Sequence, residues 1–301
     1  MIVTVTLNPA VDKTCEAGRI MPGDVNRLRS VSSVAGGKGI NVARILRQFR
    51  LPCAAMGFVG GYGGSFIEDA MLKLGVECHF TGIKGNTRIN TNIISDDGYV
   101  TELLEPGPTV SEKELESFMK EFECCLEGGG ELFVLSGSAP GGLPNDIYCT
   151  LIERCRAEKR RVFLDTSGEL LREGIKARPY LIKPNKKELE YICGRKLSDR
   201  EDIIYEARRL NEAGIEKVIV SLGSGGLLYV DSDKVLFEPA RKVKAMNTVG
   251  CGDSVVASFA MSVSAGEDME TAIKKAAALS AANATTLDAA VIPMSTYIDI
   301  L

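Results

Sequence analysis

Short apolar segments alternate with amphipathic segments along most of this chain of 301 residues. The amphipathic segments, such as Ile40–Phe49 and Asp146–Lys159, place apolar residues at three- and four-residue steps, which indicates helices. This alternation predicts an α/β fold whose mostly parallel sheet is covered by helices on both faces. The predicted strands are Ile2–Leu7, Ala54–Val59, Leu132–Gly137, Arg161–Asp165, Tyr180–Pro184 and Val218–Gly223.

Two regions interrupt the alternation, near Val11–Val34 and Arg88–Leu104. The second is rich in β-branched residues and contains an Asp-Asp-Gly turn, which predicts a hairpin. The first could supply further strands. A hairpin without flanking helices does not join a parallel sheet easily, so we interpret both regions as a small β-sheet lid. We expect a single domain over residues 1–301, with lid segments at about 11–34 and 88–105.

Composition and charge exclude several classes of function. A net charge of −4 argues against non-specific binding to nucleic acid or to an anionic membrane. We expect no secretory signal and no membrane span, because the first residues lack a basic and apolar leader and no apolar run is long enough. The nine cysteines form no CxxC or Cys/His cluster, which is typical of a cytoplasmic protein without a structural metal.

Several polar and glycine-rich loops follow predicted strands, and in an open α/β sheet such loops meet at one edge and bind ligands there. Neither a phosphate-binding GxxxxGK[ST] loop nor a GxGxxG dinucleotide motif is present. The only histidine, His79, has no sequence partners for catalysis or metal binding, and we interpret it as structural.

The segment Val34–Leu46 is a glycine loop that enters an amphipathic helix. Its glycines allow close approach of a ligand to the backbone, and Lys38 adds a cation at the helix entrance. The alternative is a merely flexible helix start.

Two further segments have a structural and a functional interpretation. Asn185 and Glu188 could order Mg²⁺ and its waters from one helix face, or they could form a capping box. The segment Ser221–Val230 is a strand, a glycine turn and a second strand. It could form the floor of a nucleotide site or simply a tight turn.

The segment Asn247–Ser254, NTVGCGDS, precedes a long apolar helix. Backbone N–H groups of Gly250, Cys251 and Gly252 could face an anion, with Asp253 beside them. In phosphoryl transfer the amides would neutralise charge on the transferred group while the carboxylate accepts a proton. The alternative for Asp253 is a helix cap.

Together, GGKGINVA (Gly36–Ala43), KPNKKE (Lys183–Glu188) and TVGCGDS (Thr248–Ser254) resemble the ribokinase-like sugar kinases of the PfkB family. TLNPAVD (Thr6–Asp12), TRIN (Thr87–Asn90), SGSAPGG and VSLGSGG extend this resemblance from the first strand to the last helices. It implies a ribokinase-like three-layer α/β/α core with a β-sheet lid.

The resemblance also implies roles for residues. Asp253 would be the catalytic base, and Gly250, Cys251 and Gly252 the anion hole. Asn185 and Glu188 would hold Mg²⁺ through its bound waters. The expected sugar contacts are Asp12, Gly36, Gly37, Lys38 and Asn41, with Arg88 and Ser138, and more loosely Arg27, at the sugar's phosphate. The expected nucleotide contacts are Lys183, Asn185, Ser221, Gly223, Ser224, Gly225, Gly226 and Thr248, with Asn283 near the adenine.

The implied reaction is ATP-dependent phosphorylation of a ketohexose phosphate, with a homodimer formed through the lid. Fructose 1-phosphate is the first expectation for the substrate and tagatose 6-phosphate the second. A sugar-phosphate sensor on the same fold is the non-enzymatic alternative, but Asp253, Asn185 and Glu188 are all retained.

Cys251 departs from the family pattern, in which this position is commonly alanine. A thiol at a helix N-terminus tends towards a lowered pKa. The sequence therefore suggests that oxidation or alkylation of Cys251 blocks the phosphate site, against the alternative of an inert, buried substitute for alanine.

Overall fold

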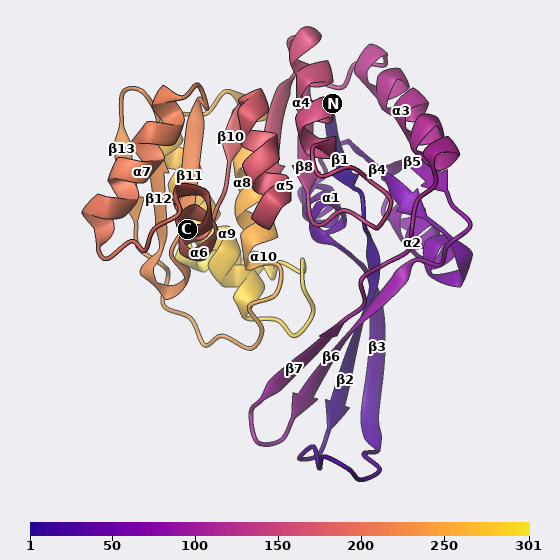
Figure 1. Cartoon of the computed structure of the whole chain (residues 1–301). Coiled ribbons are helices and arrows are strands. Elements are labelled where there is room, and N and C mark those ends of the chain that lie inside the picture. The colour runs from indigo at the N-terminus through magenta and orange to yellow at the C-terminus, as the bar shows by residue number, and fades with distance from the viewer.

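A computed structural model describes residues 1–301 and contains two β-sheets (Figure 1). The larger sheet has nine strands in the order β13-β12-β11-β10-β9-β8-β1-β4-β5. Strands β11 to β5 in this order are parallel, whereas β12 and β13 are antiparallel to their neighbours. The bounds are β1 Ile2–Thr6, β4 Cys53–Val59, β5 Glu77–Gly82, β8 Leu132–Ser136, β9 Arg161–Asp165, β10 Leu181–Ile182, β11 Lys217–Ser221, β12 Leu227–Val230 and β13 Val235–Glu238.

All six strands predicted from the sequence are present, and they form the centre of this sheet. Two edge strands, β5 and β13, were not predicted. β5 has the sequence ECHFTG and β13 has only four residues, so neither shows the continuous apolar run of a strand buried on both faces. His79 lies in β5, where its Nε2 is 2.7 Å from Glu77 Oε1.

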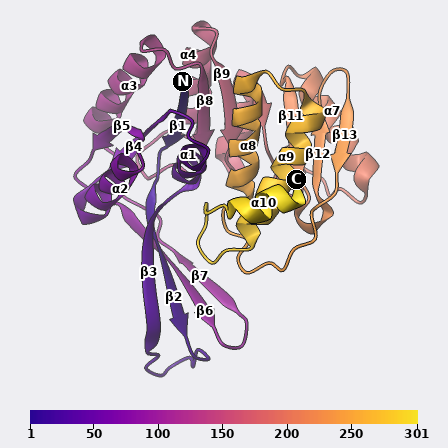
Figure 2. The ribbon, with the colours of Figure 1, turned by 180° about the vertical axis from the view of Figure 1, so that it is seen from behind.

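Helices cover both faces of the larger sheet and enclose two apolar cores (Figures 1 and 2). Alternate side chains of one strand enter different cores, as Ile2 and Val3 of β1 do. The first core is covered by α1 (Lys38–Gln48), α2 (Gly61–Lys73), α8 (Cys251–Ala265), α9 (Met269–Ala284) and α10 (Met294–Ile300). The second is covered by α3 (Glu112–Glu127), α4 (Ile147–Ala157), α5 (Gly168–Gly174), α6 (Lys186–Cys193) and α7 (Arg200–Glu212). The predicted mixed α/β fold is confirmed.

The second sheet has four strands in the order β3-β2-β6-β7 and extends away from the larger sheet (Figure 2). Its strands are β2 (Ala10–Ala17), β3 (Leu28–Gly36), β6 (Arg88–Ser95) and β7 (Val100–Leu104). β2 and β6 are parallel, and the two outer pairs are antiparallel. We call this sheet the lid. Large apolar side chains are exposed on it, among them Val31, Val100, Leu103 and Leu104.

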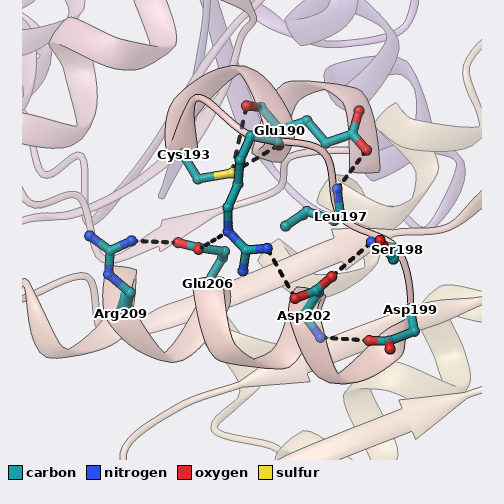
Figure 3. A network of polar contacts seen from close by, with 9 residues as sticks. Glu190, Cys193, Leu197, Ser198, Asp199, Asp202, Glu206 and Arg209 are labelled. Atoms are coloured by element: carbon teal, nitrogen blue, oxygen red, sulfur yellow. Dashed lines mark hydrogen bonds and ion pairs between the residues drawn. The ribbon is translucent and has the colours of Figure 1, made fainter.

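A polar network fixes the segment between α6 and α7 (Figure 3). Arg195 Nε and Arg209 Nη1 each donate to a different oxygen of the buried Glu206 carboxylate, both over 2.8 Å. The backbone N–H of Leu197 donates to Glu190 Oε1 over 3.0 Å. These contacts join the C-terminal end of α6 to α7, and the first turn of α6 contains Glu188.

No helix of the structure combines the length and apolar character needed to cross a bilayer.

Candidate active site

Polar residues, only some of them predicted from the sequence, gather where the carboxyl ends of parallel strands meet the amino ends of helices. Asn8 follows β1, Ser138 follows β8, Asp165 ends β9 and Lys183 follows β10. The first turns of α1, α6 and α8 begin beside them. This edge is where open α/β sheets bind ligands.

Asp253 lies in the first turn of α8 with its side chain buried. Asn41 Nδ2 donates to Asp253 Oδ2 over 2.8 Å, and Lys38 Nζ lies 3.9 Å from Oδ1. Burial raises the pKa of the Asp253 carboxyl, while Lys38 opposes that rise. The result is a carboxylate that binds a proton more readily than an exposed aspartate does.

Asp165 pairs with two lysines near Asp253. Lys38 Nζ donates to Asp165 Oδ2 over 3.0 Å, and Lys183 Nζ lies 3.2 Å from Oδ1. Burial acts to raise the pKa of Asp165, but Lys183 and Lys38 outweigh it and hold this pKa below its usual value. Burial lowers the pKa of Lys38, yet Asp165 and Asp253 leave it raised. Lys38 therefore stays charged at neutral pH.

The glycine turn before α8 depends on Gly250, whose φ of 81° lies in the left-handed region. A Cβ atom on Gly252 would lie 3.3 Å from Lys183 Nζ, so the turn and this ammonium group are adjacent. Asn283 is buried and supports the turn: its Nδ2 donates to Val249 O and its Oδ1 accepts from Ala290 N, both over 2.8 Å. Thr248 is exposed. A contact between Asn283 and adenine stays a prediction.

The carboxylate of Asp12, on β2, packs against the backbone at the end of β3. A Cβ atom on Gly36 would lie 1.9 Å from Asp12 Oδ2, so only glycine allows this approach. Asn90 Nδ2 donates to Asp12 Oδ1 over 2.9 Å. Burial raises the pKa of Asp12, while Asn90 and Arg88 act against the rise. Gly37, with a φ of 105°, connects this carboxylate to the start of α1.

Asn8 links Arg88 to Ser138. Arg88 Nη2 donates to Asn8 O over 3.0 Å, and Asn8 Nδ2 donates to Ser138 Oγ over 3.2 Å. The Asn8 and Asn90 Oδ1 atoms are buried without hydrogen-bond partners and can accept from a ligand. Arg27 is not brought to this cluster, because it precedes the far end of β3, which is roughly 20 Å along the strand from the partner of Asp12.

Asn185 and Glu188 form a reciprocal capping box at the start of α6. Asn185 Oδ1 accepts from Glu188 N over 2.9 Å, and Glu188 Oε2 accepts from Asn185 N over 2.8 Å. Glu188 Oε1 makes no hydrogen bond within the chain. The capping box expected as the structural alternative is therefore present. Glu188 Oε1 remains available to a ligand. No group of three or more His, Cys, Asp or Glu side chains is arranged to hold a metal ion.

The glycine turn after β11 lies next to this helix start, since Asn185 and Ser221 form a parallel bridge. Residues Gly223–Gly225, which include Ser224, form one 3₁₀ turn. Gly226 has a φ of 101°, and a Cβ atom there would lie 2.1 Å from Glu238 O. The predicted strand–turn–strand arrangement is thus present, and a nucleotide contact at this turn stays a prediction.

Comparisons with known proteins decide the family. Residues 3–296 match the description "pfkB family carbohydrate kinase". A 1-phosphofructokinase of Bacillus subtilis (strain 168) is 38% identical over 274 residues, which cover 91% of this chain and 89% of that relative. The chain belongs to the pfkB family of carbohydrate kinases.

Solved structures agree with this assignment. Phosphofructokinase-2 from Escherichia coli, in complex with potassium, has a TM-score of 0.93 and 27% identity, with 99% of this chain and 97% of that chain covered. A ribokinase from Thermotoga maritima, 22% identical over 100% of this chain and 98% of its own, has a TM-score of 0.80, which shows the shared fold. The ribokinase-like core expected from the sequence is confirmed. The chain is an ATP-dependent sugar-phosphate kinase.

The expectation of a lowered pKa for the Cys251 thiol is wrong. Burial raises the pKa of the Cys251 thiol, although a helix N-terminus was expected to lower it. The Sγ atom turns towards α9, where it lies 3.3 Å from Ser280 O and 3.5 Å from Asn283 Nδ2. The thiol is therefore poorly suited to oxidation or alkylation at neutral pH.

Sequence reasoning did not select Asp165, Asn8 or Asn90 as site residues. Each had a signal: Asp165 ends a predicted strand at the ligand-binding edge, Asn8 follows the first strand, and Asn90 lies in the TRIN motif. Polar residues at strand ends are common, so only their contacts with Lys38, Arg88 and Asp12 distinguish them.

Proposed function

We propose that this pfkB kinase transfers the γ-phosphoryl group of ATP to the C6 hydroxyl of fructose 1-phosphate, giving fructose 1,6-bisphosphate. The observation that carries the proposal is Asp253, a buried carboxylate held by Asn41 beside the glycine turn of α8. The identity to a 1-phosphofructokinase over most of both chains supports this substrate.

Asp253 acts as the general base in this proposal. As the hydroxyl oxygen attacks the phosphorus atom in line with the leaving group, Asp253 accepts its proton. The raised pKa of Asp253 favours that transfer. Backbone N–H groups of residues 250–252, together with Lys183 beside Gly252, stabilise the negative charge on the transferred group.

The sugar is held by the residues between the lid and the larger sheet. The Asp12 carboxylate and Asn90 Oδ1 accept hydrogen bonds from its hydroxyls, while Gly36 and Gly37 allow close approach. Lys38 and Asn41 approach the reacting end, and Arg88 and Ser138 bind the phosphate already on the sugar. Closure of the lid over the sugar excludes water and limits ATP hydrolysis.

The nucleotide occupies the side formed by Lys183, Asn185 and the turn Ser221–Gly226. Mg²⁺ supplies charge neutralisation on the phosphates when bound. The chain offers Glu188 Oε1, which is free of hydrogen bonds, and the Glu188 carboxylate lies close enough to Lys38 to raise the pKa of that lysine. Because the capping box occupies the other oxygen, Glu188 and Asn185 would hold the ion through its waters and not as direct ligands.

We also propose that the kinase is a cytoplasmic homodimer assembled through the lid. Its nine cysteines are all free, and its lid exposes apolar side chains. Tagatose 6-phosphate remains the second candidate substrate. A non-catalytic sensor is disfavoured because Asp253, Asn185 and Glu188, which the proposed mechanism uses, are all retained.

A coupled assay of ADP release tests this function. Fructose 1-phosphate, tagatose 6-phosphate and fructose 6-phosphate are compared at matched concentrations, and we expect the highest kcat/KM with fructose 1-phosphate. A higher value with tagatose 6-phosphate reassigns the substrate. No ADP release with any of the three favours the sensor.

A further inference from the structure

Five cationic side chains surround a cavity at the amino-terminal edge of the larger sheet. The cavity has a volume of about 420 Å³. It is lined by Arg156, Lys159, Arg160, Arg161, Arg178, Tyr180 and Glu216. We call it the basic pocket. It lies where β9, β10 and β11 begin, and β9 runs from Arg161 to Asp165 in the candidate active site, a strand length of roughly 13 Å. The basic pocket is therefore separate from the kinase site.

None of the five cations forms an ion pair within the chain, although the protein as a whole is negatively charged. Neighbouring cations behave differently: on the same helix, Arg154 Nη1 lies 3.0 Å from Glu123 Oε1. Glu216 is the single carboxylate in the lining and pairs with none of the five. The basic pocket thus concentrates positive charge that the chain itself does not neutralise.

Neutral groups hold these side chains in place. Arg156 Nη1 donates to Ala177 O over 2.8 Å, and Arg160 Nη2 donates to Leu126 O over 3.3 Å. The Nε atom of Arg160 is buried with no hydrogen-bond partner. These contacts orient the guanidinium groups without cancelling their charge, which is the condition for charge-assisted binding of phosphate oxygens.

The side chains that line the basic pocket also limit which kinds of ligand it can bind. Tyr180 is its only residue with an aromatic ring, and Phe163 stacks on that ring with centroids 6.1 Å apart. The Arg161 guanidinium carbon lies 5.3 Å from the Tyr180 ring centre. No free aromatic face is left for a nucleobase. We propose that the basic pocket binds a small non-aromatic anion with two or more phosphate groups, such as a sugar bisphosphate or pyrophosphate.

Isothermal titration at fixed ionic strength tests the proposal, with pyrophosphate and fructose 1,6-bisphosphate as separate probes. The pocket variant carries Lys159→Asn and Arg161→Gln. Both residues are exposed, and asparagine tolerates the φ of 55° at position 159. The control variant carries Lys113→Gln and Lys120→Gln on α3, exposed positions that give the same change in net charge. The wild type, the pocket variant and the control variant share the same kinase site, so binding there does not differ among them.

We expect the pocket variant to bind at least one probe roughly tenfold or more weakly at one class of site, while the control variant matches the wild type. The probe that loses affinity identifies the source of the phosphates. Equal titrations of all three proteins, or an equal loss in the control variant, would overturn the proposal. Kinase turnover and the thermal midpoint check that the pocket variant is folded. Arg178→Asn, at another φ of 55°, provides a second variant with the same expected loss.

Discussion

Asp253 is the residue on which the proposed chemistry depends, because it is the buried carboxylate next to the glycine turn. We expect Asp253→Asn to lower kcat by about two orders of magnitude or more while the KM for the sugar changes little, since the amide keeps the shape but accepts no proton. Steady-state kinetics measure both constants. Asp233→Asn, at an exposed position, is the control. Near-normal turnover of the Asp253 variant would contradict the mechanism.

Lys38 controls the proton affinity of Asp253 in this structure, since it is the main group that lowers the pKa of that carboxyl. The base works only when ionised, so activity is lost as the pH falls through the raised pKa of Asp253. We expect Lys38→Met to move the acid limb of the kcat profile to higher pH. Asn90, Arg88 and Arg44 are the side chains that chiefly lower the pKa of Asp12, so a shift caused by Lys38→Met assigns the limb to Asp253. An unmoved limb would assign it to another group.

Cys251 carries a thiol whose pKa is raised by burial. We expect iodoacetamide at neutral pH to alkylate the exposed Cys124 well before Cys251, as followed by mass spectrometry of peptides. We also expect Cys251→Ala to keep kcat within a few-fold of the wild type. Rapid alkylation of Cys251 with parallel loss of activity would restore the redox hypothesis.

At the scale of elements, the junction of α6 and α7 positions Asn185 and Glu188. Glu206→Ala removes the buried carboxylate that accepts from Arg195 and Arg209. We expect a loss of about 2 kcal/mol in the free energy of unfolding, measured in urea, less than for a fully buried pair because the two arginines are partly exposed. Lys234→Ala breaks an exposed pair with Glu270 and should leave the unfolding midpoint unchanged. Equal midpoints for both variants would show that the network does not support α6.

At the scale of the whole molecule, the lid exposes apolar side chains, and the proposed dimer would cover them. Leu103 and Leu104 are neighbours in β7 and point to opposite faces of the lid. We expect Leu103→Glu or Leu104→Glu to shift the dimer towards monomer in sedimentation equilibrium. Leu72→Glu on α2, exposed to the same 55% as Leu103, is the control. A monomeric wild type, or no shift in either lid variant, would contradict assembly through the lid.

Much of this molecule could be predicted because its local patterns are strong. The central strands are continuous apolar runs, and the Asp-Asp-Gly turn marks the β6–β7 hairpin. β5 and β13 could not be predicted in the same way, because an edge strand buries less of its surface and its sequence is more polar. The Asn185–Glu188 pair shows a further limit of prediction from sequence. The same three-residue spacing is compatible with a capping box and with the proposed metal role, and the sequence does not distinguish them.

The sequence by itself determined the central strands, the β6–β7 hairpin, the glycine turns at Gly36–Gly37 and Gly250–Gly252, and the family. Backbone preferences and hydrophobic periodicity act over a few residues, so they can be read directly from the chain. Only the tertiary structure decided that Asp165 joins Lys38 to Lys183, that Asn41 reaches Asp253 across 212 positions of sequence, and that the pKa of Cys251 is raised. Ion pairing and burial depend on distances through space, and those distances exist only once the sheet has brought the strand ends together.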